Sequence, residues 1–513
     1  MDIPRFLTRA SKHCWYGTSK LPLTSDSRKL TGQQHKPDAL EYVWVDTCCI
    51  DKSSSAELTQ AINSMFMWYQ NANICFVYLN DVTNDAETGP IHVAINDSHW
   101  FRRGWTLQEL IAPTSMVFFD SNWDVIGEKC DLLDELSQIT LVSRDVLSHE
   151  SALSSVCVAQ RLSWASNRNT TRVEDQAYCL LGILEINMPL LYGEGVKAFY
   201  RLQEEVLRSI NDLSIFSWSP KADLADEYCG FFAESPKDFS SCSTMQLVSG
   251  AALEDIPISI SSRGVEIMIP EYILVSDFEN NPIQYQYALK INCKTPDTEL
   301  DFLTVPMRKI GPNVFLRTRW VDTNSFEPVP VNFLENERKD LVLVTKMPKT
   351  DVHTDIVSSS RHTQVDIEFL NWNAETKTRE VPTKAWDVQD HAFFGTGSSL
   401  HNWAGISFDD LGFFVCIWSK VGDAWDIEGF LSDNSSEAMD RVWRDLFLYS
   451  DTFGFRPRSV RDMLGGIRGR KRGRHRFQDS GSFREISFVC RPRPSLGVCS
   501  GPRWVVEIRE LEA

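Results

Sequence analysis

Apolar runs and polar breaks divide the chain into an early strand–helix–strand segment and a later segment of short strands. The runs YVWVD (Tyr42–Asp46) and ICFVYL (Ile74–Leu79) are short and β-prone, which is typical of buried strands. Between them, apolar residues recur at helical spacing from Leu58 to Tyr69, and Ser54 with Glu57 has the spacing of a capping box. This succession predicts a βαβ unit and a parallel sheet.

The remainder of the chain has two further patterns. Residues 130–212 are predicted to be helical, with a second capping-box spacing at Thr171 and Glu174. Residues 230–450 contain short alternating runs separated by turn residues, which predicts a mostly β module with more than one sheet. We therefore expect five segments: an irregular leader (1–40), an α/β core (41–125), a helical extension (126–218), a β-rich module (229–450), and a basic loop with C-terminal strands (451–513).

Composition narrows the classes of function. The formal net charge is −18, which disfavours general nucleic-acid binding, and the 13 cysteines include no Cys-x-x-Cys pair of the kind that zinc sites use. The apolar runs, such as Leu411–Trp418, fall far short of the roughly 20 residues that span a bilayer. The N-terminus has no apolar run of signal-peptide length, so we expect a soluble, cytoplasmic protein without a metal site.

One basic block, residues 456–476, contrasts with the acidic chain. It contains nine Lys or Arg residues and one Asp. It is interpreted either as a solvated loop or as a nuclear import signal or phosphate-binding strip. Nucleic acid is otherwise an unlikely partner, and the nucleus is a second candidate compartment.

A first group of candidate site residues follows the strand that is predicted to end at Asp46. Ligands of parallel sheets bind beyond the carboxyl ends of the strands, so Asp46, Cys48, Cys49 and Asp51 are candidates to line a cleft. The alternative is that Asp46 caps a turn and the two cysteines pack beneath it.

A second group lies in HWFRRGWTLQELIAP, which ends at Pro113, just before another strand-like run, MVFFD. With 3.6 residues per turn, Trp105 and Glu109 share a helix face, and an indole next to a carboxylate raises the carboxylate pKa. Arg102 and Arg103 precede the helix and are candidates to hold an anionic ligand. Such a set would suit a ligand with phosphates and a sugar, although an exposed Glu109 paired with an arginine is the alternative.

Three blocks of sequence together resemble the fungal heterokaryon incompatibility (HET) domain. They are residues 41–82 (EYVWVDTCCID to FVYLNDV), residues 100–113 (WFRRGWTLQELIAP) and residues 170–205 (TTRVEDQAYCLL to RLQEE). The resemblance covers about residues 41–125, and the helical extension usual in the family runs to about residue 218. The region from Cys229 to Phe239 onward resembles the β-rich module that often follows this domain.

The resemblance implies a role in fungal nonself recognition, in which fused cells that differ at incompatibility loci die. HET domains are distantly similar to Toll-type receptor (TIR) domains, some of which cleave NAD⁺ with a glutamate in a Trp-x-x-x-Glu-Leu helix. WTLQEL fits that pattern, with Glu109 as the catalytic candidate, Trp105 as its support and NAD⁺ as the candidate substrate. This is a likeness of fold only.

The sequence departs from the family at its start, since no run like YAILSHTW occurs in residues 1–40. We therefore expect a TIR-like sheet that is incomplete at its N-terminus. Three explanations are open: the gene start is displaced, the leader replaces the first strand poorly, or the domain is degenerate. The alternatives to an NAD⁺-cleaving effector are a non-enzymatic module that self-associates and binds protein partners, and a degenerate HET remnant.

Overall fold

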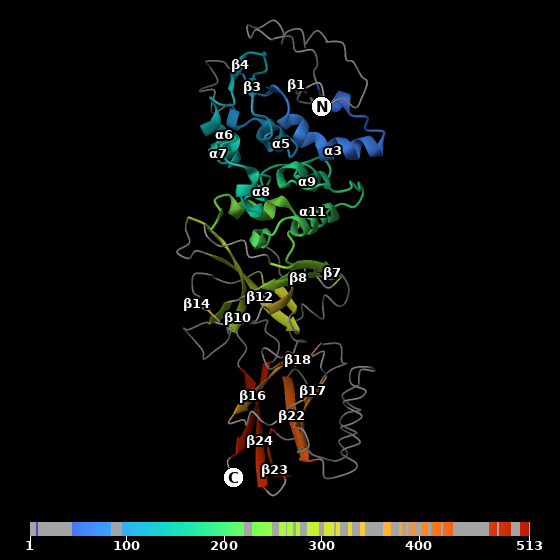
Figure 1. Cartoon of the computed structure of the whole chain (residues 1–513), viewed down its shortest axis with the longest axis vertical. Helices are drawn as coiled ribbons and strands as arrows, with labels where there is room; N and C mark the ends of the chain where they lie inside the picture. Colours follow the sequence, from blue (N-terminus) through green and yellow to red (C-terminus); the bar gives the residue numbers. More distant parts are fainter. Residues whose placement is uncertain are drawn as a thin grey trace. The chain divides into compact units, whose positions relative to one another are not determined.

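A computed structural model of the chain describes residues 7–8, 44–83, 95–219, 228–248 and 256–262, and beyond these chiefly strands between residues 264 and 511. The chain forms two compact units (Figure 1). Unit 1 comprises Met1–Lys221, Phe232–Ser259 and Lys290–Val305, and unit 2 comprises Ala222–Phe231, Ile260–Leu289 and Pro306–Ala513. Within the described ranges, no helix is both long and apolar enough to cross a membrane.

A small mixed sheet forms the α/β part of unit 1. Its order is β1-β2-β3-β4, with bounds Leu7–Thr8, Cys75–Tyr78, Met116–Phe119 and Val125–Glu128. Strands β2 and β3 are parallel, whereas β1 pairs with β2, and β4 with β3, in antiparallel fashion. The predicted parallel sheet is therefore wrong for its outer strands. The β3–β4 reversal has a local cause: Asp120 accepts hydrogen bonds from the backbone N–H groups of Asn122 and Asp124 and so closes a tight turn.

The predicted strand Tyr42–Asp46 is wrong at its C-terminal end. Val45 is extended, but Asp46 begins a short helix, α2 (Asp46–Cys49). The backbone N–H of Cys49 donates to the carbonyl of Val45 at 2.8 Å, so this carbonyl serves a helical turn. Residues 42–43 lie outside the described residues.

Helix α3 (Ser55–Gln70) confirms the predicted helix and its start. The Ser54 side chain accepts from the backbone N–H of Glu57 and caps the first turn. The helix buries Ala61, Ile62, Met65 and Tyr69. Helix α3 also packs against α10 (Leu181–Leu184). The two helices lie so close that a Cβ added to Gly182 would come within 2.1 Å of the Phe66 Cβ.

The segment HWFRRGWTLQELIAP, in which a helix was predicted to follow Arg103, forms two short elements. The 3₁₀ helix η1 (His99–Arg102) begins at Ser98, whose side chain accepts from the backbone N–H of Trp100. Helix α5 (Thr106–Ile111) follows, and all six of its residues are buried. A helix that is buried on every side belongs to a core, so its polar residues require partners inside the protein.

Residues 130–212 are largely helical, as predicted (Figure 1). Its elements, with those that follow them in unit 1, are α6 (Leu133–Thr140), α7 (Arg144–Leu147), η2 (Leu153–Ser155), α8 (Val158–Ser163), α9 (Asp175–Tyr178), α10, α11 (Lys197–Ser209), η3 (Leu213–Phe216), η4 (Pro236–Cys242), β6 (Gln246–Leu247) and β11 (Cys293–Lys294). The capping box predicted at Thr171 is wrong, because α9 begins only at Asp175 and the Glu174 carboxylate accepts from Gly193 and Gly195 instead.

Unit 2 is mostly β and contains more than one sheet, as predicted. Its described strands in the nine-stranded sheet are β5 (Tyr228–Cys229), β7 (Ile258–Ser261), β8 (Gly264–Ile269), β9 (Ile273–Ser276), β10 (Tyr285–Ile291), β12 (Leu303–Gly311), β13 (Val314–Thr318), β14 (Glu327–Pro330) and β15 (Lys339–Leu343). Strands β7, β10 and β12 include residues that belong to unit 1. Phe315 and Leu316 of β13 are buried, as are Val265 and Ile267 of β8.

The remaining described strands form a six-stranded and a four-stranded sheet. They are β16 (Thr363–Leu370), β17 (Arg379–Val381), β18 (Trp386–Asp387), β19 (Ala392–Gly395), β20 (Trp403–Phe408), β21 (Gly412–Val421), β22 (Ala424–Asp433), β23 (Arg472–Asp479), β24 (Ser482–Arg493) and β25 (Arg503–Leu511). The basic block is not wholly a loop, because residues 472–476 pair with β24 as part of β23; residues 456–470 lie outside the described residues.

Candidate functional site

Glu109 lies in the middle of the buried helix α5 and is only 4% exposed. The hydroxyl group of Tyr69, on α3, donates a hydrogen bond to Glu109 Oε1 at 3.2 Å. The second carboxyl oxygen, Oε2, is buried without a hydrogen-bond partner. Glu109 is therefore the acidic centre of a core contact between α3 and α5 and is closed to bulk water.

Burial, and to a smaller extent the negative charge of Asp46, raise the pKa of Glu109, which lies at about 8. The charges of Arg103 and Arg168 and the hydrogen bond from Tyr69 act in the opposite direction. The net result is a carboxyl group that is mostly protonated at neutral pH. Burial and the nearby Glu109 also raise the pKa of the Tyr69 hydroxyl well above its ordinary value.

Arg168, which was not anticipated from the sequence, links this centre to the segment before α5. Its side chain is buried (6% exposed), and its Nη1 donates to the Arg103 carbonyl and the Thr106 hydroxyl, each at 2.9 Å. Burial lowers its pKa to about 10, so the guanidinium remains charged. Arg168 Nη2 and Arg103 Nη1 are buried without hydrogen-bond partners, as is Glu109 Oε2. Orphaned buried polar atoms are uncommon in proteins and call for an explanation.

Trp105 does not cover Glu109 in the manner predicted. Helix α5 begins only at Thr106, and the Trp105 indole donates a hydrogen bond to the carboxylate of Asp175. The Tyr192 hydroxyl donates to the same carboxylate at 2.9 Å. Tyr69 is therefore an aromatic residue that contacts Glu109, whereas Trp105 links the start of α5 to α9 through its hydrogen bond to Asp175.

The residues of the first candidate group take different roles. Asp46 is half-buried at the start of α2, near enough to Glu109 and Tyr69 to influence both. Asp51 is exposed, and its Oδ1 accepts from the Ser53 backbone N–H and hydroxyl, which lowers its pKa. Asp51 thus caps a turn. Cys49 is half-buried in α2; the side chain of Cys48 lies outside the described residues.

The two arginines of the RRG sequence also diverge. Arg102 is exposed, and its carbonyl accepts from the backbone N–H of Asn169 at 2.7 Å. Arg103 is half-buried, with its charge acting on Glu109. The next residue, Gly104, leaves no room for a side chain, since an added Cβ would come within 2.5 Å of Thr170 Cγ2. The glycine therefore allows this segment to approach Asn169 and Thr170 closely.

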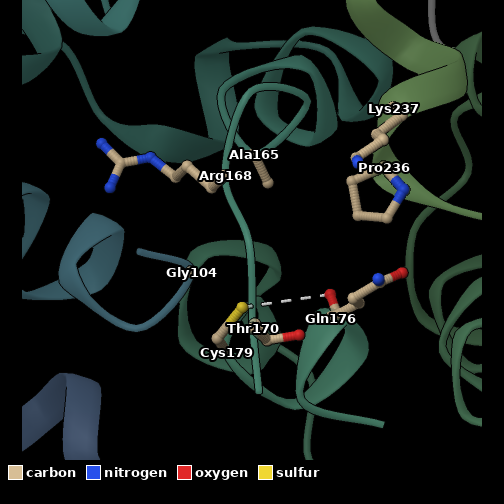
Figure 2. A pocket seen from close by; sticks show the side chains of 8 residues that line it. All are labelled: Gly104, Ala165, Arg168, Thr170, Gln176, Cys179, Pro236 and Lys237. Carbon is tan, nitrogen blue, oxygen red and sulfur yellow. Dashed lines mark hydrogen bonds between the residues drawn. The ribbon is translucent and has the colours of Figure 1, made fainter. Parts of the chain in front are cut away.

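A small surface pocket, partly open to solvent, has Gly104 in its lining (Figure 2). Its lining includes Cys179, whose thiol donates to the carbonyl of Gln176 at 3.9 Å and whose pKa burial raises to about 12. In Figure 2 the guanidinium of Arg168 points away from Pro236 and Lys237. The pocket thus presents little reactive chemistry, and Glu109 does not line it. In the described part of the chain, no cluster of three His, Cys, Asp or Glu side chains could hold a metal ion.

Sequence reasoning identified Glu109 and Arg103 but missed Tyr69 and Arg168. Tyr69 belonged to the apolar stripe of α3, where nothing local distinguishes a tyrosine that donates a hydrogen bond from one that only packs. Arg168 comes from a segment 62 residues from its partner Thr106. The residues around Arg168, Ser166 to Thr171, are all polar, so the local sequence gives no sign that this arginine is buried.

Comparisons with known proteins agree with the resemblance of the sequence blocks. The family model for heterokaryon incompatibility protein (HET) matches residues 7–93, and a model for a domain of unknown function (DUF8212) matches residues 197–229. The vegetative incompatibility protein HET-E-1 of Podospora anserina is 48% identical over 174 residues, which are 33% of this chain and 13% of the relative. The chain thus corresponds to a small part of that relative. Residues 7–93 thus match the HET family, and a third of the chain is similar to a fungal vegetative incompatibility protein.

Proposed function

We propose that this protein acts in fungal heterokaryon incompatibility, as an effector that promotes the death of fused cells that differ at incompatibility loci. The observation that carries the proposal is the 174-residue match, at 48% identity, to a vegetative incompatibility protein. That match corresponds to a third of this chain. We therefore assign recognition of the partner that signals nonself to the remaining residues, including the β-rich unit 2.

Expression of the full chain in a filamentous fungus tests the proposal. The protein is produced from an inducible promoter and fused to a domain that dimerises on addition of a small molecule, because the natural trigger is unidentified. We expect growth arrest and cell lysis after dimerisation. A variant with a charge in the α5 core, Leu107→Asp, should be harmless at equal abundance, since Leu107 is fully buried. Undisturbed growth with abundant, dimerised wild-type protein would contradict the proposal.

We infer that the candidate chemistry is cleavage of the N-glycosidic bond of NAD⁺, with Glu109 as the carboxylate that stabilises positive charge at the anomeric carbon. Three buried atoms support this assignment: Glu109 Oε2, Arg103 Nη1 and Arg168 Nη2 each lack a hydrogen-bond partner. One acceptor and two cationic donors are the groups that a ribose hydroxyl and a diphosphate would engage. Glu109 is covered and largely neutral in this arrangement, so activity would require an opening of the segment around α5.

The same burial favours a second candidate function, a signalling module that self-associates without chemistry. Comparison of wild type with Glu109→Gln separates the two. If Glu109 is catalytic, the dimerised wild type consumes NAD⁺ at a rate that rises with pH toward about 8, as the carboxyl ionises, and the variant neither consumes NAD⁺ nor kills. If the module is non-enzymatic, the variant kills as well as wild type does, and NAD⁺ persists in both.

A further inference from the structure

Three buried thiols from distant parts of the sequence meet in unit 1. Cys157 immediately precedes α8, Cys242 ends η4, and Cys293 lies in β11. Cys157 and Cys293 are each 1% exposed and both are reduced. None of them belongs to the cluster around Glu109, so their convergence requires its own account.

Hydrogen bonds place Cys157 and Cys293 next to the same short segment, residues 243–247. The Cys157 thiol donates to the carbonyl of Met245 at 3.8 Å, and the Gln160 amide donates to the carbonyl of Ser243 at 2.9 Å. Strand β6 follows directly and pairs with β11, with Cys293 opposite Leu247. The start of α8 and strand β11 therefore both contact residues 243–247.

We propose that Cys157 and Cys293 form a redox-sensitive pair whose oxidation to a disulfide joins the HET helical extension to strand β11. The position of β11 in the chain gives this bond its significance. Residues 290–305 belong to unit 1, whereas residues 260–289 and 306–513 belong to unit 2. A disulfide at Cys293 would thus fix the short stretch, residues 290–305, by which the chain passes from unit 2 into unit 1 and back to unit 2.

The pKa values of the two thiols shift in opposite directions. The thiol of Cys293 donates a hydrogen bond to the sulfur of Cys157, which lowers the pKa of Cys157 and raises that of Cys293. The Gln160 backbone N–H and the Ser214 hydroxyl also stabilise a Cys157 thiolate. Cys242 differs from both, because its thiol donates to the carbonyl of Ser217 at 3.6 Å. Cys157 is therefore the nucleophile, since the thiolate is the reactive form.

Hydrogen peroxide is the oxidant class that closes the bond in two steps. The Cys157 thiolate attacks one peroxide oxygen; an S–O bond forms, the O–O bond breaks, and the departing hydroxide takes up a proton to become water. The Cys293 sulfur then attacks the Cys157 sulfur; the S–S bond forms, the S–O bond breaks, and the second hydroxide leaves as water with the Cys293 proton. Two thiols are oxidised, and one peroxide is reduced to two waters.

Peptide mapping of the full-length protein tests the proposal directly. Native protein is treated with hydrogen peroxide, unfolded, alkylated and digested with trypsin. The sequence allows a clean assignment, because trypsin places the three cysteines in separate peptides, residues 145–161, 238–263 and 291–294. We expect peptide 145–161 joined to peptide 291–294, two hydrogen atoms lighter than the sum, and an equal loss of alkylation at both cysteines. Dithiothreitol should restore alkylation.

Two variants sharpen the test. Cys293→Ser should abolish the linked peptide and leave Cys157 to oxidise further or remain alkylatable, whereas Cys179→Ser removes an equally buried thiol of unit 1 and should keep the link. The wild-type mapping does not depend on whether a variant folds. Full alkylation of Cys157 and Cys293 after peroxide treatment, or a link between Cys293 and Cys242 in place of Cys157, would overturn the proposal.

Discussion

Glu109 and Glu174 are two largely buried carboxyl groups of the same unit in opposite electrostatic environments. Glu109 accepts one hydrogen bond, from Tyr69, and its other oxygen has none. The Oε1 of Glu174 accepts from two backbone N–H groups, those of Gly193 at 2.8 Å and Gly195 at 3.0 Å. The pKa of Glu109 rises to about 8, whereas backbone hydrogen bonds lower the pKa of Glu174.

The difference shows that the supply of donors decides which form of a carboxyl the fold prefers. At Glu174 the loop LYGEG supplies the donors, and Gly193 and Gly195 have positive φ angles of 103° and 61°, which glycine adopts without strain. At Glu109 the two arginines act through charge alone, because neither donates a hydrogen bond to it. Glu174 is thus built into a loop as an anion, whereas Glu109 is held mostly as a neutral acid with a single hydrogen-bond donor, Tyr69.

The largest predicted effect is a dependence of stability on pH that originates at Glu109. Its folded pKa of about 8 exceeds the unfolded value of about 4.5, so between these values the folded state retains a proton that the unfolded state has lost. Stability contributed by this group should therefore fall as pH rises through that window, by about 1.4 kcal/mol per pH unit. Urea unfolding between pH 5 and pH 9 measures the slope.

Glu109→Gln keeps a neutral side chain of the same shape and should flatten this slope, leaving the variant more stable than wild type by about 3 kcal/mol at pH 7. Glu150→Gln, which neutralises an exposed glutamate of the same unit, is the matched control and should leave the slope unchanged. An equal slope in Glu109→Gln and wild type would remove the electrostatic account of this centre.

Gly104→Ala should destabilise the packing of the segment that precedes α5, which carries Glu109, without changing any charge. The added Cβ would meet Thr170 Cγ2 at 2.5 Å and Cys179 Sγ at 3.1 Å, so we expect a loss of about 1–3 kcal/mol in the free energy of unfolding. Addition of Thr170→Ser removes the clashing methyl group and should recover part of the loss. A matched change on the Glu174 side, Gly195→Ala, meets no atom within 4 Å and should cost only the strain of its positive φ, about 1 kcal/mol.

Failure of Thr170→Ser to recover any stability would show that Gly104 is needed for another reason. Urea denaturation of the single and double variants decides the point, since contacting residues give a measurable coupling energy.

Most elements of the fold follow from local patterns in the sequence. Helix α3 was predicted from an apolar period of 3.6, strands β2 and β3 from short continuous apolar runs, and the β character of residues 230–450 from short alternating runs. The errors lie where a side chain decides the backbone path. Asp120 closes the β3–β4 turn, and Glu174 serves a loop in place of a capping box.

The candidate site was predictable only in part, because its contacts join distant segments. Glu109 stood out as a charge in an apolar helix, but its donor Tyr69 lies 40 residues away on the face of α3 that packs in the core. The predicted Trp105–Glu109 pair assumed that one helix holds both residues. Trp105 is the N-cap of α5 and has helical backbone angles, but its indole donates a hydrogen bond to the carboxylate of Asp175.

A smaller effect of opposite sign is expected at Glu174. Its folded pKa lies below the unfolded value near 4.5, so it contributes stability above that pH and loses it as pH falls through the folded value. Glu174→Gln keeps an acceptor for the two glycine N–H groups but loses the charge, and should cost about 1 kcal/mol at pH 7. The cost should vanish in acid, as measured by urea unfolding from pH 7 to pH 3; a constant cost would indicate packing rather than charge.

The smallest predicted effect isolates the single hydrogen bond that Glu109 receives. Tyr69→Phe removes the donor and should cost about 1 kcal/mol at pH 7, where the acceptor is mostly neutral, and more above pH 8, because hydrogen bonds to charged groups are stronger. The loss also raises the pKa of Glu109, since this bond lowers it. Tyr78→Phe is the matched control: its hydroxyl donates to the Ser121 carbonyl at 3.0 Å, so its cost should not change with pH. If the two substitutions share one pH dependence, Tyr69 stabilises the core by packing alone, and the contrast between Glu109 and Glu174 reduces to the presence or absence of backbone donors.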